Sequence, residues 1–276
     1  MSWHARLDLD YALEEGRSVA RFRHEGPLRI LQSLYPQGPA VCHNILVHPP
    51  GGLVGGDTLD LRIKVAAQAH GLITTPGATR FYRSTGEQAV QRTQLELAAG
   101  ARLEWLPLEA LCFAGCLGEN RLEMRLAPGA ELIGWDITAL GLPQSGQPFT
   151  AGRLLQHIEV PGLWLERAQL DAADDRLMNS PLGLAQRRCL ATLFFISGNP
   201  IDRQGRENWL EQTRGCLAGH PLMTTAGVTS PNDQMVVLRI LSPLVEPAML
   251  LMRQVWQAWR RCAWQMDAPP PRIWST

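Results

Sequence analysis

Three acidic residues stand in surroundings where a carboxylate is unusual. Asp136 lies within an apolar segment, Asp57 closes a glycine-rich segment, and Glu166 sits beside Arg167 in another apolar stretch. An unpaired charge away from water is costly, so each carboxylate needs a partner. Two interpretations stay open: the acids form structural ion pairs, or they are oxygen ligands for a cation. The arginines considered as ion-pair partners are Arg80, Arg83 and Arg167.

Histidine and cysteine, the softer metal ligands, are scattered along the chain. The seven histidines contain no pair spaced i, i+4; they are His4, His24, His43, His48, His70, His157 and His220. Cys42 and His43 are adjacent, and adjacent residues of a strand point to opposite faces. Free cysteine is usually buried, which favours inert packing for Cys112 and Cys116 over a ligand or nucleophile role. His48 alone keeps an open functional role, because it stands at the entry of the glycine-rich segment.

The glycine-rich segment runs from His48 to Asp57 and links two predicted strands, residues 45–47 and 59–65. The residues that exclude an ordinary helix or strand here are Pro49, Pro50, Gly51, Gly52, Gly55 and Gly56. The segment lacks the Gly-Lys-Ser/Thr ending of a P-loop and the helix that follows a dinucleotide fingerprint. A tight structural turn explains the glycines but not so long and specific a string.

Composition limits the classes of partner. The chain has 276 residues and a formal net charge of zero, so neither nucleic acid nor an anionic membrane is expected to bind it. Its six cysteines are irregularly spaced and predict no disulfide framework. No apolar signal core follows Met1, and no apolar run reaches the length of a membrane span. We therefore expect a cytoplasmic protein.

Strand signals dominate the first two thirds of the chain. The 25 glycines and 20 prolines predict many turns between short strands. Four glycines precede strand-like runs at spacings of 29, 29 and 33 residues; they are Gly71, Gly100, Gly129 and Gly162. A regular spacing with strand content predicts stacked β-coils or layered sheets, not a doubly wound α/β fold.

Helical periodicity is confined to the C-terminal third. Residues 208–217 form a short candidate helix, and a longer one begins near Glu246. Residues 235–241 between them are predicted to be a buried strand. The longer helix has a broad apolar face, which is expected to pack across a sheet and to leave apolar surface for a partner.

These patterns together predict a mostly β fold, with layered or β-helix-like stacked strands and a small helical element in the C-terminal third. A chain of this length can bury a substantial core as one domain. The expected organisation is a single domain over residues 1–276, β-rich over 1–205 and mixed strand and helix over 206–276.

Several blocks of the sequence resemble the urease accessory protein D family. Residues 49–57 match its Pro-Pro-Gly-Gly-x-x-Gly-Gly-Asp segment. Residues 74–84 are similar to its Thr-Pro-Gly-Ala-x-Lys/Arg-Phe-Tyr-Arg-Ser block, which here contains Arg80, Tyr82 and Arg83. The remaining matches are residues 103–109 and 134–136, Pro181, and the closing residues 271–276. The resemblance spans roughly residues 3–276.

The resemblance implies a mostly β protein that is not an enzyme. Such proteins join accessory proteins F and G, bind apo-urease, and pass nickel from the GTPase G through their interior to the urease site. No cofactor is then tightly bound, and nickel is in transit. Transit suits weak oxygen ligands and water better than a closed four-ligand cage. On this basis the candidate passage residues are Asp57, Asp136, Glu166 and His48.

Asp136 is the most informative of these candidates. Alternation places it on one face with Gly134 and Thr138, and such small neighbours predict room beside the carboxylate.

A purely structural adaptor, which assembles the activation complex without handling metal, is the alternative function. A hydrolase is disfavoured, because the sequence contains neither Gly-x-Ser-x-Gly nor His-Glu-x-x-His.

The chain departs from the family pattern at three positions. Leu142 and Gln147 stand where the family usually shows Arg and Glu, and Leu108 replaces the usual Gln. The expected fold does not depend on these side chains. Any role that depends on charges in this loop is therefore not expected to carry over to this chain.

Overall fold

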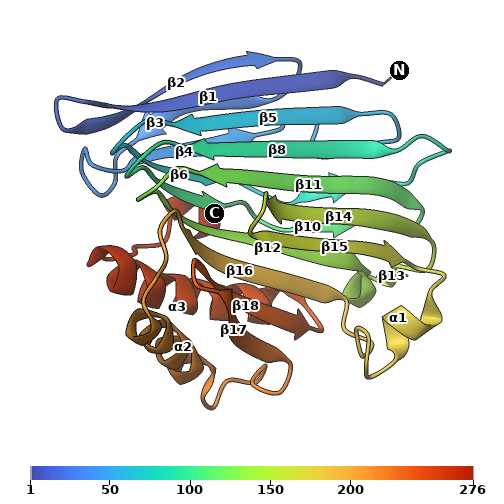
Figure 1. The fold of residues 1–276 in the computed structure, drawn as a ribbon. Helices are drawn as coiled ribbons and strands as arrows, with labels where there is room; N and C mark the ends of the chain where they lie inside the picture. Colours follow the sequence, from blue (N-terminus) through green and yellow to red (C-terminus); the bar gives the residue numbers. More distant parts are fainter. Residues whose placement is uncertain (1, 276) are drawn as a thin grey trace.

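The computed structural model describes residues 2–275 and contains two β-sheets that pack face to face (Figure 1). Sheet A follows the order β15 (Trp164–Asp171), β14 (Gly152–Val160), β11 (Cys116–Leu126), β8 (Ala89–Leu97), β5 (Thr58–Val65), β1 (His4–Glu14), β2 (Arg17–Glu25). Sheet B follows the order β17 (Ala226–Asn232), β18 (Met235–Ser242), β16 (Cys189–Ser197), β12 (Glu131–Leu142), β9 (Arg102–Leu106), β6 (His70–Thr74), β4 (Cys42–Val47), β3 (Arg29–Leu34). Beside this path lie β7 (Thr79–Phe81), β10 (Ala110–Cys112) and β13 (Gln147–Pro148).

Successive coils of the chain build both sheets together. Each of the coils β5–β6, β8–β9 and β11–β12 adds one strand to sheet A and the next to sheet B, and neighbouring coils pair in parallel. The turn of each coil has the sequence Ala-x-x-Ala, at residues 66–69, 98–101 and 127–130, and its last amide donates to its first carbonyl. The predicted mostly β, solenoid-like stacking is therefore confirmed.

The repeat is nevertheless not a repeat of glycines. Gly100 and Gly129 occupy the Ala-x-x-Ala turns with φ of 68° and 74°, a conformation that side chains disfavour. Gln68, with φ of 61°, takes the equivalent place in the earlier turn. Gly71 instead lies inside β6, and Gly162 lies in the antiparallel hairpin between β14 and β15. The predicted glycine period is thus wrong at Gly71, whereas Gly162 does lie in a turn before a strand, with the Leu163 amide donating to the Val160 carbonyl at 2.9 Å.

Strand alternation decides which side chains enter the space between the sheets. In β5, Leu59, Leu61, Ile63 and Val65 are buried, and the side chains between them face outward. This confirms the alternation predicted for residues 59–65. Inward apolar side chains of both sheets form one continuous core, whose burial is the main stabilising contribution.

The helices are α1 (Asp175–Asn179), α2 (Arg203–Leu217) and α3 (Val245–Trp264), with short 3-10 turns η1 (Pro143–Ser145) and η2 (Arg272–Ser275). The first long helix begins earlier than the predicted residue 208, because the Asp202 carboxylate accepts a hydrogen bond from the Gly205 amide at 2.6 Å and caps it. The predicted strand at 235–241 and the long helix that starts near Glu246 are both present.

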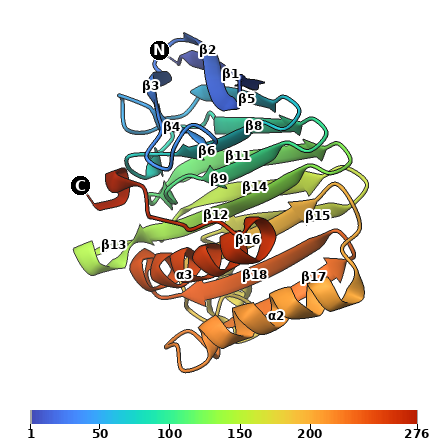
Figure 2. The same cartoon turned by 90° about the vertical axis from the view of Figure 1, so that its left-hand side faces the viewer.

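Figure 2 shows α2 and α3 against the outer face of sheet B. A second core forms between these helices and the sheet, and it includes Leu251, Val255 and Trp259 of α3. The expectation that the apolar face of α3 awaits a partner is therefore wrong, because the chain's own sheet and α2 cover it. The closing segment is ordered through Ser275, and the family-block residue Thr276 lies outside the described residues.

Candidate functional site

The glycine-rich segment crosses from β4 in sheet B to β5 in sheet A and pairs with β7 on the way. The Leu53 amide donates to the Arg80 carbonyl at 2.7 Å, and the Tyr82 amide donates to the Leu53 carbonyl at 2.9 Å. Gly52 is required at this contact, since a Cβ there would lie 2.4 Å from the Tyr82 ring. The loop is therefore hydrogen-bonded to β7 through its backbone and is not an isolated turn.

Asp57 fixes the end of this loop. Its carboxylate, 1% exposed, accepts hydrogen bonds from the backbone amides of Val54 at 2.9 Å and Trp3 at 3.2 Å. Neither Arg80 nor Arg83 is its partner. The partner of this buried acid is thus backbone N–H groups, which hold the loop and the N-terminal segment together.

His48 lines a cavity of about 210 Å³ at the rim of the loop. Its ring lies 5.0 Å from the Trp3 ring, and its Nε2 is buried with no hydrogen-bond partner among the described residues. Burial lowers the pKa of the imidazole, and the nearby Asp57 carboxylate opposes this shift. Gly51, Thr79, Arg80 and Gln91 also line the cavity. His48 is therefore a neutral ring with a free nitrogen close to an open cavity.

Asp136 lies between the two sheets, 8% exposed, on β12. Asn120 Nδ2 donates to its Oδ2 at 2.9 Å, Thr138 Oγ1 donates to its Oδ1 at 3.4 Å, and Gln156 Nε2 also donates to Oδ1. All three donors are neutral. Burial raises the pKa of Asp136 to about 6, the hydrogen bonds oppose that shift, and the Glu166 charge adds to it.

A second, much smaller cavity of about 20 Å³ adjoins Asp136. It has room for about one water molecule. Thr79 and Gln91 line both this cavity and the larger one beside His48. Gln91 Nε2 also donates to Asn120 Oδ1 at 3.3 Å. Polar groups therefore continue from the loop cavity to the Asp136 carboxylate.

Glu166 on β15 continues the polar run on the other side. Thr192, the cross-strand neighbour of Asp136 on β16, donates to Glu166 Oε1 at 3.4 Å. Arg239 on β18 donates to Glu166 Oε2 through Nε at 3.0 Å and Nη2 at 2.6 Å. The neighbouring Arg167 is not the ion-pair partner, because alternation points it to the opposite face. The expected arginine partners are thus replaced by Arg239, which comes from a distant strand.

The structure places Glu166 near Asp136, since Thr192 lies opposite Asp136 and donates to Glu166, while Asp57 and His48 lie at the loop. The room predicted beside Asp136 is only partly present. At Gly134 the Phe194 ring fills the space, since a Cβ there would lie 2.5 Å from it. The free space lies instead toward Asn120, at the small cavity.

Sequence inspection did not single out Gln91, Asn120 or Gln156. Each is a polar residue in the inward phase of an alternating strand of sheet A, and the residues two positions before and after it are buried. That signal was available, because Leu122 and Met124 set the phase for Asn120. A polar residue at a strand position where alternation predicts a buried side chain is therefore the sequence pattern that identifies these residues.

A second buried polar cluster, also not predicted, lies between sheet B and α3. Glu104 is fully buried, with Oε1 3.0 Å from His70 Nε2 and Oε2 accepting from Trp256 Nε1 at 2.7 Å. Arg260 Nε lies 3.1 Å from Glu104 Oε2. Burial alone would raise the pKa of Glu104, but the His70 hydrogen bond and the Arg260 charge outweigh it, and the pKa is lowered.

Other candidates stay apart from these networks. The six cysteines are free, and Cys42, Cys112 and Cys116 are buried. Among residues 2–275, no group of three or more His, Cys, Asp or Glu side chains is close enough to hold a metal ion. Over the same described residues, no helix is long and apolar enough to cross a membrane.

The departures from the family pattern also have defined places. Leu142 on β12 and Gln147 on β13, two of the three departures, are cross-strand partners. Leu108 lines the small cavity beside Asp136, where it presents an apolar side chain instead of an amide.

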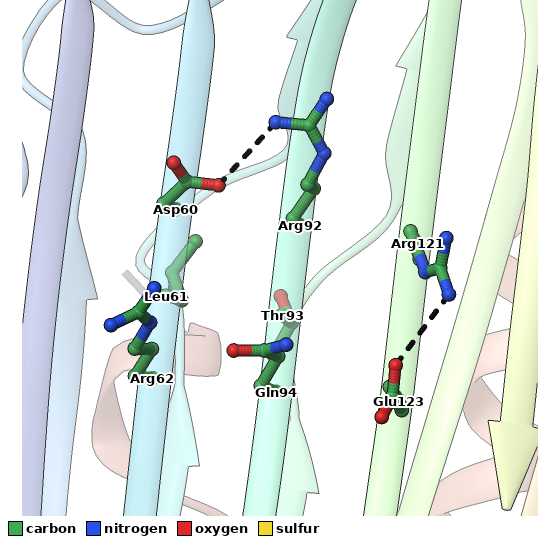
Figure 3. A pocket seen from close by; sticks show the side chains of 8 residues that line it. All are labelled: Asp60, Leu61, Arg62, Arg92, Thr93, Gln94, Arg121 and Glu123. Carbon is green, nitrogen blue, oxygen red and sulfur yellow. Dashed lines mark ion pairs between the residues drawn. The ribbon is translucent and has the colours of Figure 1, made fainter. Parts of the chain in front are cut away.

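The outer face of sheet A carries a further hollow of about 350 Å³ (Figure 3). Arg92 lies 3.7 Å from Asp60, and Arg121 lies 3.5 Å from Glu123. These solvent-exposed pairs contribute little stability. None of the candidate passage residues lines this hollow.

Comparison with known proteins adds a family match. A family model described as UreD urease accessory protein matches residues 4–275. A protein of Variovorax paradoxus named Urease accessory protein UreD is 65% identical over 276 residues, and the match covers all of both chains. Proteins with the same name from a Polaromonas species and from Leptothrix cholodnii are 65% and 51% identical, again over the whole of both chains.

Proposed function

Because this chain belongs to the UreD urease accessory protein family, we propose that it is a non-catalytic cytoplasmic maturation factor that conveys nickel toward apo-urease. In this proposal it joins accessory proteins F and G and passes the ion between its two sheets. The single observation that carries the proposal is the polar run from the His48 cavity through Gln91, Asn120 and Asp136 to Glu166.

The chemistry of this run suits an ion that must keep moving. Carboxylate, amide and hydroxyl oxygens and a single imidazole hold a divalent ion more weakly than a set of thiolates and imidazoles. Asp136 is bound only by neutral donors, so a cation can take over its charge without breaking an ion pair. Burial raises its pKa to about 6, so near neutral pH most of the carboxyl is ionised and can act as a ligand, while a fall in pH protonates it.

The two ends of the run differ. At the loop end, the cavity of about 210 Å³ leaves space for an ion with part of its water shell. At the other end, the Arg239 guanidinium closes on Glu166. An ion that reaches Glu166 must displace this guanidinium, which makes the ion pair the narrow point of the proposed route.

The test measures nickel and assembly together. Asp136→Ala, Glu166→Ala and Asp57→Ala are each assayed for urease nickel content and for yield of the complex with accessory proteins F and G. We expect nickel content to fall for Asp136→Ala and Glu166→Ala while complex yield stays at the wild-type level. Asp57→Ala is expected to lower yield as well, because Asp57 holds two backbone amides of the loop.

Asp60→Ala is the matched control, since it removes a carboxylate from the outer face of sheet A. The alternative function is a purely structural adaptor, and the tightness of the cavity beside Asp136, about 20 Å³, favours it. If nickel content falls only where complex yield falls, the adaptor takes the place of the conduit.

A further inference from the structure

The glycine-rich loop and the segment that begins with β7 and pairs with it carry a set of exposed and half-exposed side chains, one of which, Arg80, lines the 210 Å³ cavity. We call this set the loop face; its residues are Pro49, Pro50, Val54, Arg80, Tyr82 and Arg83. It combines apolar and cationic groups, and Val54 is 44% exposed. Tyrosine and arginine are among the residue types most enriched at the centres of protein interfaces.

The aromatic ring of the loop face is packed in place before any partner arrives. The Tyr82 ring packs on Gly52 and stacks on Phe113, with ring centroids 5.0 Å apart. Arg80 lies beside Gly51, and the stem of Arg83 lies against Gly115. Binding therefore costs less side-chain entropy at Tyr82 than at a freely moving side chain.

The two guanidiniums on this face have no acidic partner. Among residues 2–275, neither Arg80 nor Arg83 forms an ion pair or a side-chain hydrogen bond. Asp57, the acid of the loop, is buried and bound to backbone amides. Glu87 lies close to Gly56, at the other end of the loop. The loop face is thus a local positive patch on a chain whose net charge is zero.

This positive charge conflicts with a route for a divalent cation that opens beside it. Arg80 lines the cavity, and an approaching bare cation would be repelled at short range. The conflict disappears when carboxylates pair with the two guanidiniums. Arginine binds carboxylates in a bidentate, charge-assisted geometry, which also fixes the orientation of the partner.

We propose that the loop face docks a carboxylate-bearing surface of a protein partner, which neutralises Arg80 and Arg83 and so admits the cation to the cavity. The proposal rests on the proposed function for the cation, but the docking itself does not require metal. It assigns a role to Arg80, Tyr82 and Arg83, three family-block residues that have no role in the proposed nickel passage.

The test compares two charge-reversal variants of the full-length chain. Arg80→Glu/Arg83→Glu reverses the loop face, and Arg62→Glu/Arg167→Glu reverses two exposed arginines on the outer face of sheet A. Both variants change the net charge equally. The probes are purified accessory protein F and purified apo-urease, with binding measured at low and high salt and thermal unfolding as a fold control.

We expect the loop-face variant to bind one of the two probes roughly 100-fold more weakly, with a reduced salt dependence, and the sheet A variant to bind like the wild type. Arg80→Lys/Arg83→Lys is expected to retain part of the affinity, because the charge remains while the bidentate geometry is lost. Wild-type affinity of the loop-face variant for both probes, or an equal loss in the sheet A variant, would overturn the proposal.

Asp136→Asn separates this proposal from the proposed function. It is expected to bind both probes normally and to lower urease nickel content. If it transfers nickel normally, the conduit fails, while the docking result stands. If it behaves as expected and the loop-face variant still binds both probes, the docking proposal alone fails.

Discussion

Two carboxylates are buried in the two cores of this molecule, and their surroundings differ in one respect. Glu104, between sheet B and α3, faces the Arg260 guanidinium at 3.1 Å. Asp136, between sheets A and B, is bound by two amides and a hydroxyl, all neutral. The pKa of Glu104 is therefore lowered, whereas the pKa of Asp136 is raised to about 6. A fixed cation makes a buried acid part of the scaffold, and neutral donors leave it free to exchange a proton or a metal ion.

The environment around the two acids extends this difference. Glu104 ties β9 to α3, because Trp256 and Arg260 both reach it from the helix. Asp136 adjoins a cavity of about 20 Å³, is linked through Asn120 to Gln91, and lies opposite Thr192, which donates to Glu166. Glu104 therefore stabilises the packing of α3 on sheet B, whereas Asp136 lies beside a small polar cavity between sheets A and B.

The largest expected effect is the loss of stability on removing Glu104. Glu104→Ala leaves the buried Arg260 charge without its partner and is expected to cost roughly 3–5 kcal/mol. Asp136→Asn, the matched variant in the other core, is expected to cost no more than about 1–2 kcal/mol, since neighbouring amides can reorient. Urea unfolding of both variants measures the difference. Equal losses would remove the distinction between a scaffold acid and an exchangeable acid.

The second prediction concerns pH. The folded pKa of Asp136, about 6, lies above its ordinary value of 3.8, so the folded state retains a proton that the unfolded state loses. Its contribution to stability is present at low pH and is lost as pH rises to about 6, by up to about 3 kcal/mol. Glu104 has the opposite sign, because its lowered pKa contributes stability that is lost as pH falls below 4.5.

Unfolding free energies of the wild type and Asp136→Asn from pH 4 to 7 test this sign. The wild type should lose stability relative to the variant as pH rises through this window. Parallel curves would mean that Asp136 titrates normally in the folded chain, and the comparison with Glu104 would then rest on geometry alone.

A smaller effect is expected when one donor to Asp136 is removed. Asn120→Ala deletes the 2.9 Å hydrogen bond to Oδ2 and is expected to cost roughly 1–2 kcal/mol. It should also raise the pKa of Asp136 further, since a hydrogen bond to the charged form is lost. The carboxyl titration, followed by NMR, is the readout that separates this effect from simple loss of packing. Leu122→Ala, an inward neighbour with no polar contact, is the control.

The smallest expected effect is at Glu166, which is partly exposed. Arg239→Met removes its ion pair and is expected to cost about 0–1 kcal/mol, because such pairs are weak where solvent reaches them. The same change should raise the rate of nickel transfer to urease, since it removes the guanidinium that closes the run. A stability loss as large as that of Glu104→Ala would place Glu166 with the scaffold acids.

Much of the fold could be predicted because its periodicity is local. The alternation over residues 59–65 and the helical pattern after Glu246 each depend on side chains only a few residues apart. The glycine spacing predicted stacked coils, but Gly71 lies within a strand, since the turn that repeats is Ala-x-x-Ala. The start of α2 was missed because Asp202 caps it outside the apolar periodic stretch.

For the candidate site, the sequence could predict which residues take part but not which of them contact each other. Asp136 and Glu166 stand out in the sequence as acids among apolar residues, and the inward phase of Asn120 and Gln156 could have been read there as well. Their mutual contacts could not, because they lie on strands from different coils and different sheets. Glu166 pairs with Arg239, 73 residues away, rather than with its neighbour Arg167.

The sequence by itself determined the strand-rich class, the position of the glycine-rich loop and the acids that needed partners, because alternation, backbone restriction and desolvation act on single residues and their near neighbours. Only the tertiary structure decided which partner each acid received. Asp57 received backbone amides, Asp136 received neutral side chains, and Glu166 received Arg239 from β18, while Glu104, which the sequence did not single out, received Arg260 from α3. The reason is physical: the stacking of coils and the docking of a helix set distances between residues far apart in the chain, and those distances fix whether a buried charge is neutralised, solvated by dipoles or left free to bind.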